Sequence, residues 1–188
     1  TTEDPIGAFS SSFTLNAQVV LADKDYIRII SSVFKKADVD IDGMVPITLA
    51  EKNLILDDSE QKDSIMLLDI GSEYTDIGVF NENKFMYTNA IPVGGQNITN
   101  DIALVLNISD EEAEKLKKQY GLALRSYIDN DTEIVLNTVK DGNKIVRSSR
   151  IVEIIEARVE QIFELVNKDV TNQGIKANIN NVVLTGQG

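Results

Sequence analysis

Residues 65–71 read IMLLDIG, a nearly continuous apolar run that meets the carboxylate of Asp69 and ends in Gly71. A run of this kind is typical of a strand that is buried on both faces of a sheet. Residues 76–80 and 84–88 read as the next two strands, joined by a short polar turn. We therefore predict three consecutive strands in this region.

Helical spacing returns after these strands, and the rest of the chain mixes helices with strands. Apolar side chains recur every three to four residues, and a serine three residues before a glutamate forms a capping box at the second helix. A helix is predicted from Gly95, with Ile98, Ile102, Val105 and Leu106 on its apolar face, and a second from Ser109 to Tyr120, stopped by a left-handed Gly121. A hairpin follows, with strands 132–139 and 144–147 around a type I′ turn at Asp141-Gly142. The last predicted elements are a helix over 149–169 and a strand over 181–184.

The first fifty residues read as a small α/β unit of their own. Residues 9–22 alternate as a strand, a helix fits over 25–36, and a short strand is predicted over 39–46. Another helix is predicted over 48–56, and the boundary between the two parts of the chain is predicted near residues 46–63. The whole chain is therefore predicted to be mixed α/β.

The composition excludes several classes of chemistry. The chain has 188 residues without histidine or cysteine, which rules out Ser-His-Asp and Cys-His nucleophiles, zinc thiolate sites, histidine-ligated metals and disulfides. The 18 Lys and Arg residues against 30 Asp and Glu residues give a formal net charge of −12, so nucleic acid and anionic lipid are poor direct partners. No apolar run is long enough to span a bilayer. Because the chain lacks an initiator Met and a signal peptide and stops directly after an apolar strand, we expect a fragment of a longer protein, cut at both ends.

Two glycine-containing motifs are suited to binding an anion. A strand that ends in Asp69-Ile70-Gly71 and returns at Thr75 can place backbone amides against an anion, while the carboxylate can hold Mg²⁺ through water. The pair Gly94-Gly95 precedes a helix, whose N-terminus favours an anion. Each motif also has an ordinary explanation, since Asp-Gly at a strand end is commonly a turn and two glycines commonly form a bend.

Two further features are suited to the nucleoside part of a nucleotide. Glu114 and Lys117 are spaced to share one helix face, where they could grip a ribose and a base or simply form a solvated ion pair. Residues 185–188, TGQG, follow an apolar strand and could form a loop under a nucleotide or an ordinary turn.

In this order, the motifs resemble the FtsA family of bacterial cell-division proteins, within the actin-like ATPase superfamily. The opening DPIGAF and the unit after it look like the latter part of the family's subdomain 1C, so the resemblance covers essentially the whole chain. The most specific parts are the IPVGG-x-x-IT-x-DIA run and AE-x-LK-x-x-YG. The segments that carry the resemblance are LLDIGSEYTDIGVF (67–80), IPVGGQNITNDIALVL (91–106), EEAEKLKKQYG (111–121) and VVLTGQG (182–188).

The resemblance implies an actin-like (ribonuclease H-like) domain with a mixed sheet flanked by helices, plus a small α/β subdomain. It assigns residues 1–49 to part of subdomain 1C, which replaces subdomain 1B of actin. Residues 50–188 then form domain 2, subdomain 2A with a 2B-like insertion at about 122–170.

A site for ATP and Mg²⁺ is also implied. Asp69 would lie near the magnesium ion and the attacking water, as a catalytic residue and metal ligand, while Glu114 and Lys117 would contact the adenosine. Thr99 belongs to the family's run after the two glycines. The remaining nucleotide-binding residues implied by the resemblance are Gly71, Ser72, Thr75, Gly94, Gly95, Gly186 and Gly188.

For the parent protein, the resemblance implies a cytoplasmic adaptor of the division septum. Such a protein binds the C-terminal tail of FtsZ in its 2B region and self-associates into filaments. It is held at the inner face of the cell membrane only through a C-terminal helix that this chain lacks. The parent is expected to be a weak ATPase, and this chain an inactive lobe, because the first phosphate motif of the family is missing.

One residue departs from the family pattern at the phosphates. The family usually follows D-x-G with small residues and threonine, whereas this chain has Ser72-Glu73-Tyr74-Thr75. If Glu73 faces the terminal phosphate, two unit charges about 4 Å apart at an effective dielectric near 20 repel by about 4 kcal/mol. Tight ATP binding is then not expected.

Two other classes of protein share the same core and stay open at this point. One is an actin-like ATPase or sugar-kinase-type enzyme, which would need a substrate-activating carboxylate and a sugar pocket. The other is a DnaK-type chaperone lobe or a pilus-assembly relative.

Overall fold

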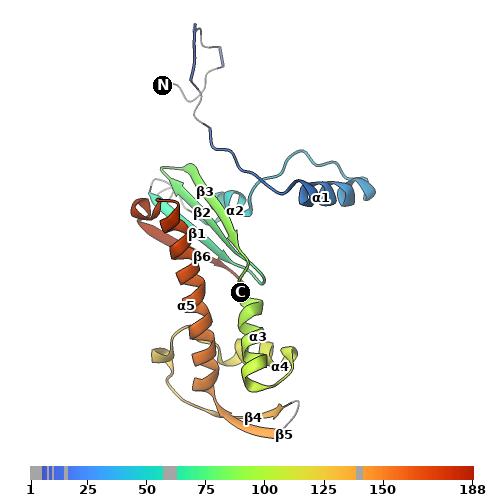
Figure 1. Cartoon of the computed structure of the whole chain (residues 1–188), viewed down its shortest axis with the longest axis vertical. Helices are drawn as coiled ribbons and strands as arrows, with labels where there is room; N and C mark the ends of the chain where they lie inside the picture. Colours follow the sequence, from blue (N-terminus) through green and yellow to red (C-terminus); the bar gives the residue numbers. More distant parts are fainter. Residues whose placement is uncertain (1–5, 8, 10, 15–16, 57–62, 139–141) are drawn as a thin grey trace. The chain divides into compact units, whose positions relative to one another are not determined.

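Figure 1 shows the computed structural model of the chain, which divides into two units, Thr1–Gly43 and Met44–Gly188. The structure describes residues 6–7, 9, 11–14, 17–56, 63–138 and 142–188. The two units are described separately.

The first unit contains one helix, α1 (Lys24–Lys36), in its described residues. The helix begins where Asp23 accepts a hydrogen bond from the Tyr26 amide at 2.9 Å, and it confirms the predicted helix. The strands predicted over 9–22 and 39–46 are absent from the described residues of those ranges. Alternation alone cannot make a strand, because a strand also needs a partner for its backbone.

A mixed four-stranded sheet forms the first half of the second unit. Its order is β3-β2-β1-β6, with β1–β2 and β2–β3 antiparallel and β1–β6 parallel. The register sets Asp69 opposite Asp76 on one neighbour and Thr185 on the other. The strands are β1 (Ser64–Ile70), β2 (Thr75–Asn81), β3 (Lys84–Ile91) and β6 (Asn181–Gly186). They confirm the three consecutive strands and the last strand predicted from the sequence.

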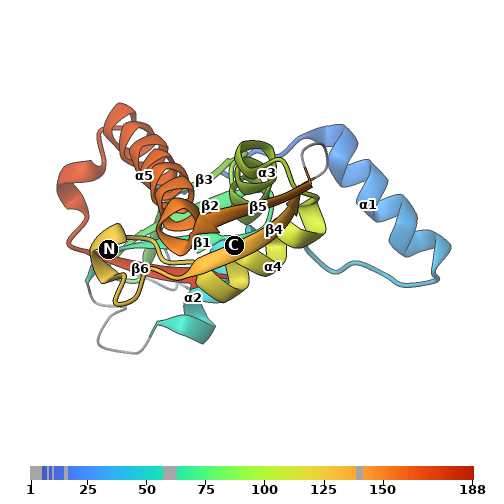
Figure 2. The same cartoon turned by 90° about the horizontal axis from the view of Figure 1, so that it is seen from below.

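The central strand β1 is buried on both faces, as its apolar run predicted. Leu67 and Leu68, which point to opposite faces, are both 0% exposed. Helix α2 (Ile47–Ile55) contacts β1 and β2, and a Cβ atom on Gly78 would lie 2.6 Å from the Cβ atom of Thr48. A glycine at this position therefore allows the helix to approach the sheet. Figure 2 shows α2 and α5 on opposite sides of β1 and β6.

A helical layer and a hairpin form the second half of this unit. Helix α5 runs from the hairpin to the sheet (Figure 1), so its first turns pack in one core and its last turns in the other. The predicted helices are all present, but Val105 is 43% exposed and does not belong to the buried face of its helix. The elements are α3 (Gly95–Leu106), α4 (Asp110–Tyr120), η2 (Arg125–Tyr127), β4 (Glu133–Thr138), β5 (Gly142–Arg147), α5 (Ser148–Asn172) and η3 (Lys176–Asn178).

The end of α4 differs from the prediction. Gly121 has φ −67°, so it is not left-handed, whereas Asn107 after α3 is left-handed with φ 57°. A Cβ atom on Gly121 would lie 2.2 Å from the carbonyl oxygen of Lys117. Close approach to that carbonyl therefore favours glycine here. The predicted hairpin is present, with Thr138 paired to Gly142, although Asp141 lies outside the described residues.

Candidate functional site

The turn between β1 and β2 lies at one end of the sheet. The Gly71 amide donates to the carbonyl oxygen of Tyr74 at 2.9 Å, which closes the turn and leaves Ser72 and Glu73 exposed at its tip. The buried Thr75 hydroxyl donates to the carbonyl oxygen of Val93 at 2.8 Å. That bond ties the start of β2 to the segment that leads into α3.

The backbone at the start of α3 packs directly on this turn. The Gly95 amide donates to the carbonyl oxygen of Gly71 at 2.9 Å, and the Gln96 amide donates to that of Ser72 at 2.7 Å. A Cβ atom on Gly94 would lie only 2.5 Å from the Gly71 carbonyl oxygen. The second glycine motif therefore lies against the first.

The segment after β6 reaches the same place. The Gly188 amide donates to the carbonyl oxygen of Ile70 at 2.8 Å, and a Cβ atom on Gly95 would lie 2.5 Å from the Gly188 Cα atom. Gly186 has φ +106°, and a Cβ atom there would lie 2.1 Å from the Ile70 carbonyl oxygen. We call the set Gly71, Gly94, Gly95, Gly186 and Gly188 the glycine cluster.

Glu114 and Lys117, on α4, lie beside the glycine cluster. The Lys117 ammonium lies 2.8 Å from Glu114 Oε2 and donates to the Gly95 carbonyl oxygen at 3.1 Å. The Thr99 hydroxyl donates to the same Glu114 oxygen at 2.5 Å. Burial raises the pKa of Glu114, but hydrogen bonds from Lys117, Thr99 and Lys118 outweigh it and hold the pKa at about 2. All the site residues that the resemblance implied thus lie in or beside the glycine cluster.

A carboxylate that the sequence did not single out lies near Asp69. Burial, followed by the carboxylates of Asp69 and Asp76, raises the pKa of Glu51 on α2. Burial and Asp69 raise the pKa of Asp76 as well. Glu51 was missed because nothing in its spacing reveals which strands α2 covers. Within the described ranges, no three acidic side chains are arranged to hold a metal ion directly, so a Mg²⁺ ion at Asp69 would keep much of its water.

A small cavity of about 170 Å³ lies against the last part of the glycine cluster. Its lining is mostly apolar, and it takes side chains from both α3 and α5. Apolar walls of this kind suit the flat face of a base better than a phosphate. The lining residues are Ile70, Ile98, Val159, Ile162, Thr185, Gly186 and Gly188.

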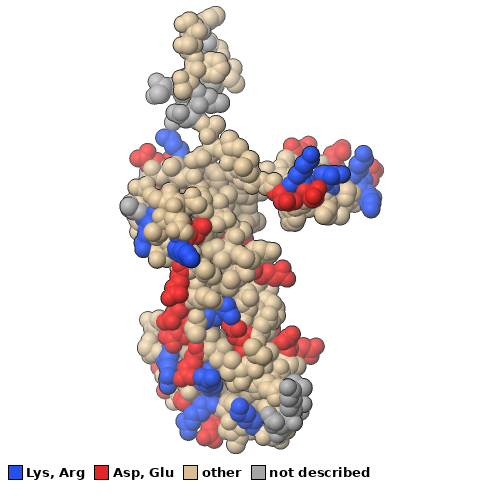
Figure 3. All heavy atoms as spheres, viewed as in Figure 1, with Lys and Arg blue, Asp and Glu red and all other residues tan. Residues whose placement is uncertain are grey.

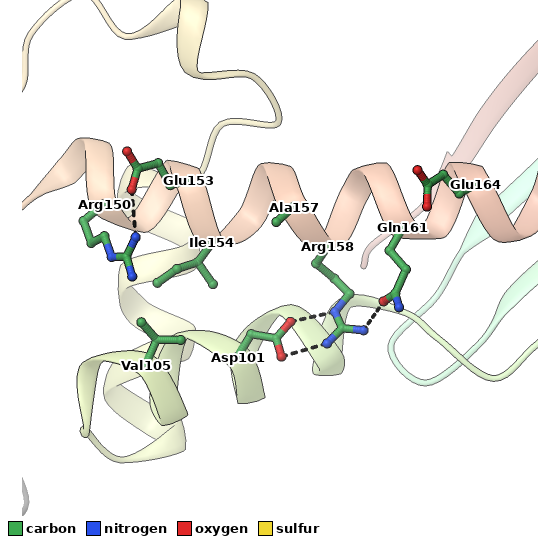
Figure 4. A pocket seen from close by; sticks show the side chains of 9 residues that line it. All are labelled: Asp101, Val105, Arg150, Glu153, Ile154, Ala157, Arg158, Gln161 and Glu164. Atoms are coloured by element: carbon green, nitrogen blue, oxygen red, sulfur yellow. Dashed lines mark hydrogen bonds and ion pairs between the residues drawn. The ribbon is translucent and has the colours of Figure 1, made fainter.

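A larger hollow of about 570 Å³ lies between α3 and α5, and we call it the α3–α5 groove. Figure 4 shows Arg158 bridging the two helices, with its Nε and Nη2 atoms 2.6 and 2.8 Å from the carboxylate oxygens of Asp101. Arg150 lies toward the other end, where its Nη1 atom donates to Glu153 at 2.9 Å. The groove is lined by Asp101, Val105, Arg150, Glu153, Ile154, Ala157, Arg158, Gln161 and Glu164.

The rim of the α3–α5 groove carries charge of both signs. Hydrogen bonding to Arg150, together with the charge of Arg125, keeps the pKa of Glu153 below its usual value. Along α5, Glu153, Glu156, Glu160 and Glu164 share one helix face because they are spaced by three or four residues. Figure 3 shows acidic side chains gathered along the side of the molecule where α5 lies. Within the described residues, no helix is long and apolar enough to cross a membrane.

Comparison with known proteins identifies a family for this chain. The family model described as "Cell division protein FtsA" matches residues 66–185. The FtsA of Bacillus subtilis is 30% identical over 97% of this chain and 42% of its own length. The FtsA of Escherichia coli K12 is 25% identical over 98% of this chain and 46% of its own length. The chain therefore spans less than half the length of these relatives.

Solved structures share the fold at lower identity. MreB5 of Spiroplasma citri bound to ADP superposes with a TM-score of 0.68 and 17% identity, over 87% of this chain and 54% of that one. A PilM–PilN type IV pilus biogenesis complex superposes with a TM-score of 0.61 and 16% identity. That match covers 86% of this chain and 40% of the other. The fold is therefore actin-like, and the predicted fold class is confirmed.

Proposed function

Since this chain belongs to the FtsA family of cell-division proteins, we propose that it is the part of a division adaptor that binds an adenine nucleotide and tethers FtsZ. One observation carries the nucleotide part of the proposal. Turns that are far apart in the sequence meet in the glycine cluster, beside Glu114 and Lys117. Because these glycines have no side chains, the backbone segments pack against one another and bring Asp69, Glu114 and Lys117 around one place.

The residues present fit the adenosine end of a nucleotide best. Glu114 and Lys117 would orient the ribose, Gly186 and Gly188 would lie under the adenosine, and the small apolar cavity would receive part of the base. Asp69 would hold a hydrated Mg²⁺ ion, which when bound offsets the negative charge of the phosphates. MreB5 of Spiroplasma citri, which shares the fold, has been solved with ADP and with AMPPNP bound, and this supports a nucleotide as the ligand. By itself, one lobe is expected to be inactive in hydrolysis, because phosphoryl transfer depends on positioning from both sides.

The α3–α5 groove is the proposed site for the FtsZ tail. Its lining runs along α5 from Arg150 to Glu164, about 21 Å of helix, which is enough for a short extended peptide. Val105, Ile154 and Ala157 offer apolar contacts for one side chain. The Arg158 guanidinium is already bound by Asp101, whereas the Arg150 side chain is 54% exposed and pairs with Glu153. Arg150 is therefore the cation best placed to receive a carboxylate of the peptide.

Calorimetry with a synthetic FtsZ C-terminal tail peptide tests the tethering role. Arg150→Gln is expected to weaken binding about tenfold, because it removes a charged hydrogen-bond donor from the rim of the groove. Lys84→Gln, a matched loss of one exposed positive charge at the start of β3, is expected to leave the affinity unchanged. A folded chain that does not bind the peptide, or equal effects of the two variants, would contradict the assignment.

The remaining roles belong to the parent protein. We propose that it self-associates into filaments and attaches to the inner face of the cell membrane through a C-terminal amphipathic helix. Sedimentation of the full-length protein with lipid vesicles, with and without that helix, tests the attachment. Equal co-sedimentation of the two forms would contradict it.

A further inference from the structure

Four of the five glycines in the glycine cluster have amide groups that are already hydrogen-bonded within the protein. The Gly71, Gly95 and Gly188 amides donate to backbone carbonyl oxygens at 2.8–2.9 Å, and the Gly94 amide donates to the Asn97 side chain at 2.9 Å. An amide that is bonded within the protein cannot also bind a phosphate oxygen without rearrangement. The glycines therefore bring the backbone segments together but do not themselves form a phosphate cradle.

The donors that remain lie at the tip of the turn between β1 and β2. The amides of Ser72 and Glu73 have no hydrogen bond to another described residue, and both residues are exposed. They follow Asp69, the residue that the proposed function sets nearest the terminal phosphate and its Mg²⁺ ion. A terminal phosphate bound by these amides would lie beside the Glu73 carboxylate.

The surroundings of this tip are acidic. Asp69 and Asp76 are directly opposite one another on β1 and β2, and Glu51 approaches both from α2. The Lys117 ammonium, which lies beside Gly95, is already held by Glu114 and the Gly95 carbonyl oxygen. A Mg²⁺ ion at Asp69 would offset the charge of that carboxylate, but a terminal phosphate at the turn would still add negative charge near Asp76, Glu51 and the exposed Glu73.

We propose that this site selects against a terminal phosphate, so that the chain binds ADP more tightly than ATP, with Glu73 as the specificity-determining residue. The proposal rests on the proposed nucleotide function and narrows its ligand to the diphosphate. Two unit charges a few ångströms apart near a protein surface repel strongly, but solvent weakens this repulsion at an exposed turn. We expect ADP to bind at least about tenfold more tightly than ATP, a difference of about 1.4 kcal/mol.

Calorimetric titration of the chain with ADP and with ATP, each in excess Mg²⁺, tests the proposal. Glu73→Gln keeps the shape of the side chain and removes its charge, so it is expected to tighten ATP binding at least about tenfold and to change ADP binding little. Glu82→Gln is the matched control. Glu82 is an exposed glutamate in the turn at the other end of β2, roughly 20 Å away for a strand of this length. Glu82→Gln is expected to change neither the affinity for ADP nor the affinity for ATP.

The outcomes separate the inference from the function on which it rests. Equal binding of ADP and ATP by the unsubstituted chain, or an unchanged ATP affinity in Glu73→Gln, would overturn the selectivity and leave nucleotide binding intact. If neither nucleotide binds either protein, both the proposed nucleotide function and the selectivity are overturned.

Discussion

The glycine cluster and the α3–α5 groove are held together by different parts of the chain. In the cluster, backbone amides and carbonyl groups from three segments bond to one another, and the missing side chains allow the contact. In the groove, side chains such as Arg158 and Asp101 connect two helices. A backbone junction should tolerate almost no added atom, whereas a side-chain junction should lose stability in proportion to the bonds removed.

The largest loss of stability is expected from a substitution in the glycine cluster. Gly186→Ala is expected to destabilise the second unit by about 3 kcal/mol, because a left-handed residue would gain a Cβ atom that clashes with the Ile70 carbonyl oxygen. Gly142→Ala is the control, since Gly142 is also left-handed but has nothing within 4 Å of the added atom. Strain alone is expected to cost about 1 kcal/mol there. Urea unfolding followed by circular dichroism measures both, and equal losses would show that the clash is relieved.

A smaller loss of stability is expected when the ion pair in the α3–α5 groove is removed. The side chains of Arg158 and Asp101 are 23% and 28% exposed, so their two-bond pair is partly shielded from water. A double-mutant cycle of Asp101→Ala and Arg158→Ala is expected to give a coupling free energy of about 1–2 kcal/mol. Urea unfolding of the four proteins measures it. A coupling near zero would mean that packing of α3 on α5, and not this pair, holds the groove.

The smallest loss of stability is expected at Glu114, which joins α4 to α3 through the Thr99 hydroxyl and holds Lys117 beside the glycine cluster. Its pKa of about 2 lies below the unfolded value near 4.5, so ionised Glu114 stabilises the fold above pH 4.5, and the stabilisation is lost as the pH falls toward 2. Since the side chain is 34% exposed, solvent screening should reduce the contribution to about 1 kcal/mol.

Glu114→Gln should therefore flatten the acid side of the stability curve between pH 4.5 and 2. Glu111→Gln, an exposed position on the same helix, serves as the control. Unfolding curves at a series of pH values compare the two variants. The same acid dependence in Glu114→Gln and in the unsubstituted chain would contradict the assignment of this ion pair.

The elements of this chain could largely be read from the sequence because their signals are local. The apolar run before Asp69 gave a buried strand, and the helical stripe over 149–169 gave the core of α5, which extends to Ser148–Asn172. The same reasoning was wrong for residues 9–22 and 39–46, since a strand depends on a partner as well as on its own alternation. It was also wrong for the conformation of Gly121, because glycine is favoured by a close carbonyl as well as by a positive φ.

For the candidate site too, part could be predicted from the sequence and part could not. The sequence by itself determined which motifs are present and in what order, and their order pointed to the family. Only the tertiary structure decided that Gly95 bonds to Gly71 and Gly188 to Ile70, that Glu51 approaches Asp69, and that four of the five amides of the glycine cluster are already occupied. These contacts join segments that are far apart along the chain, and their geometry is set by how the helices and the sheet pack. No local pattern of residues records that packing.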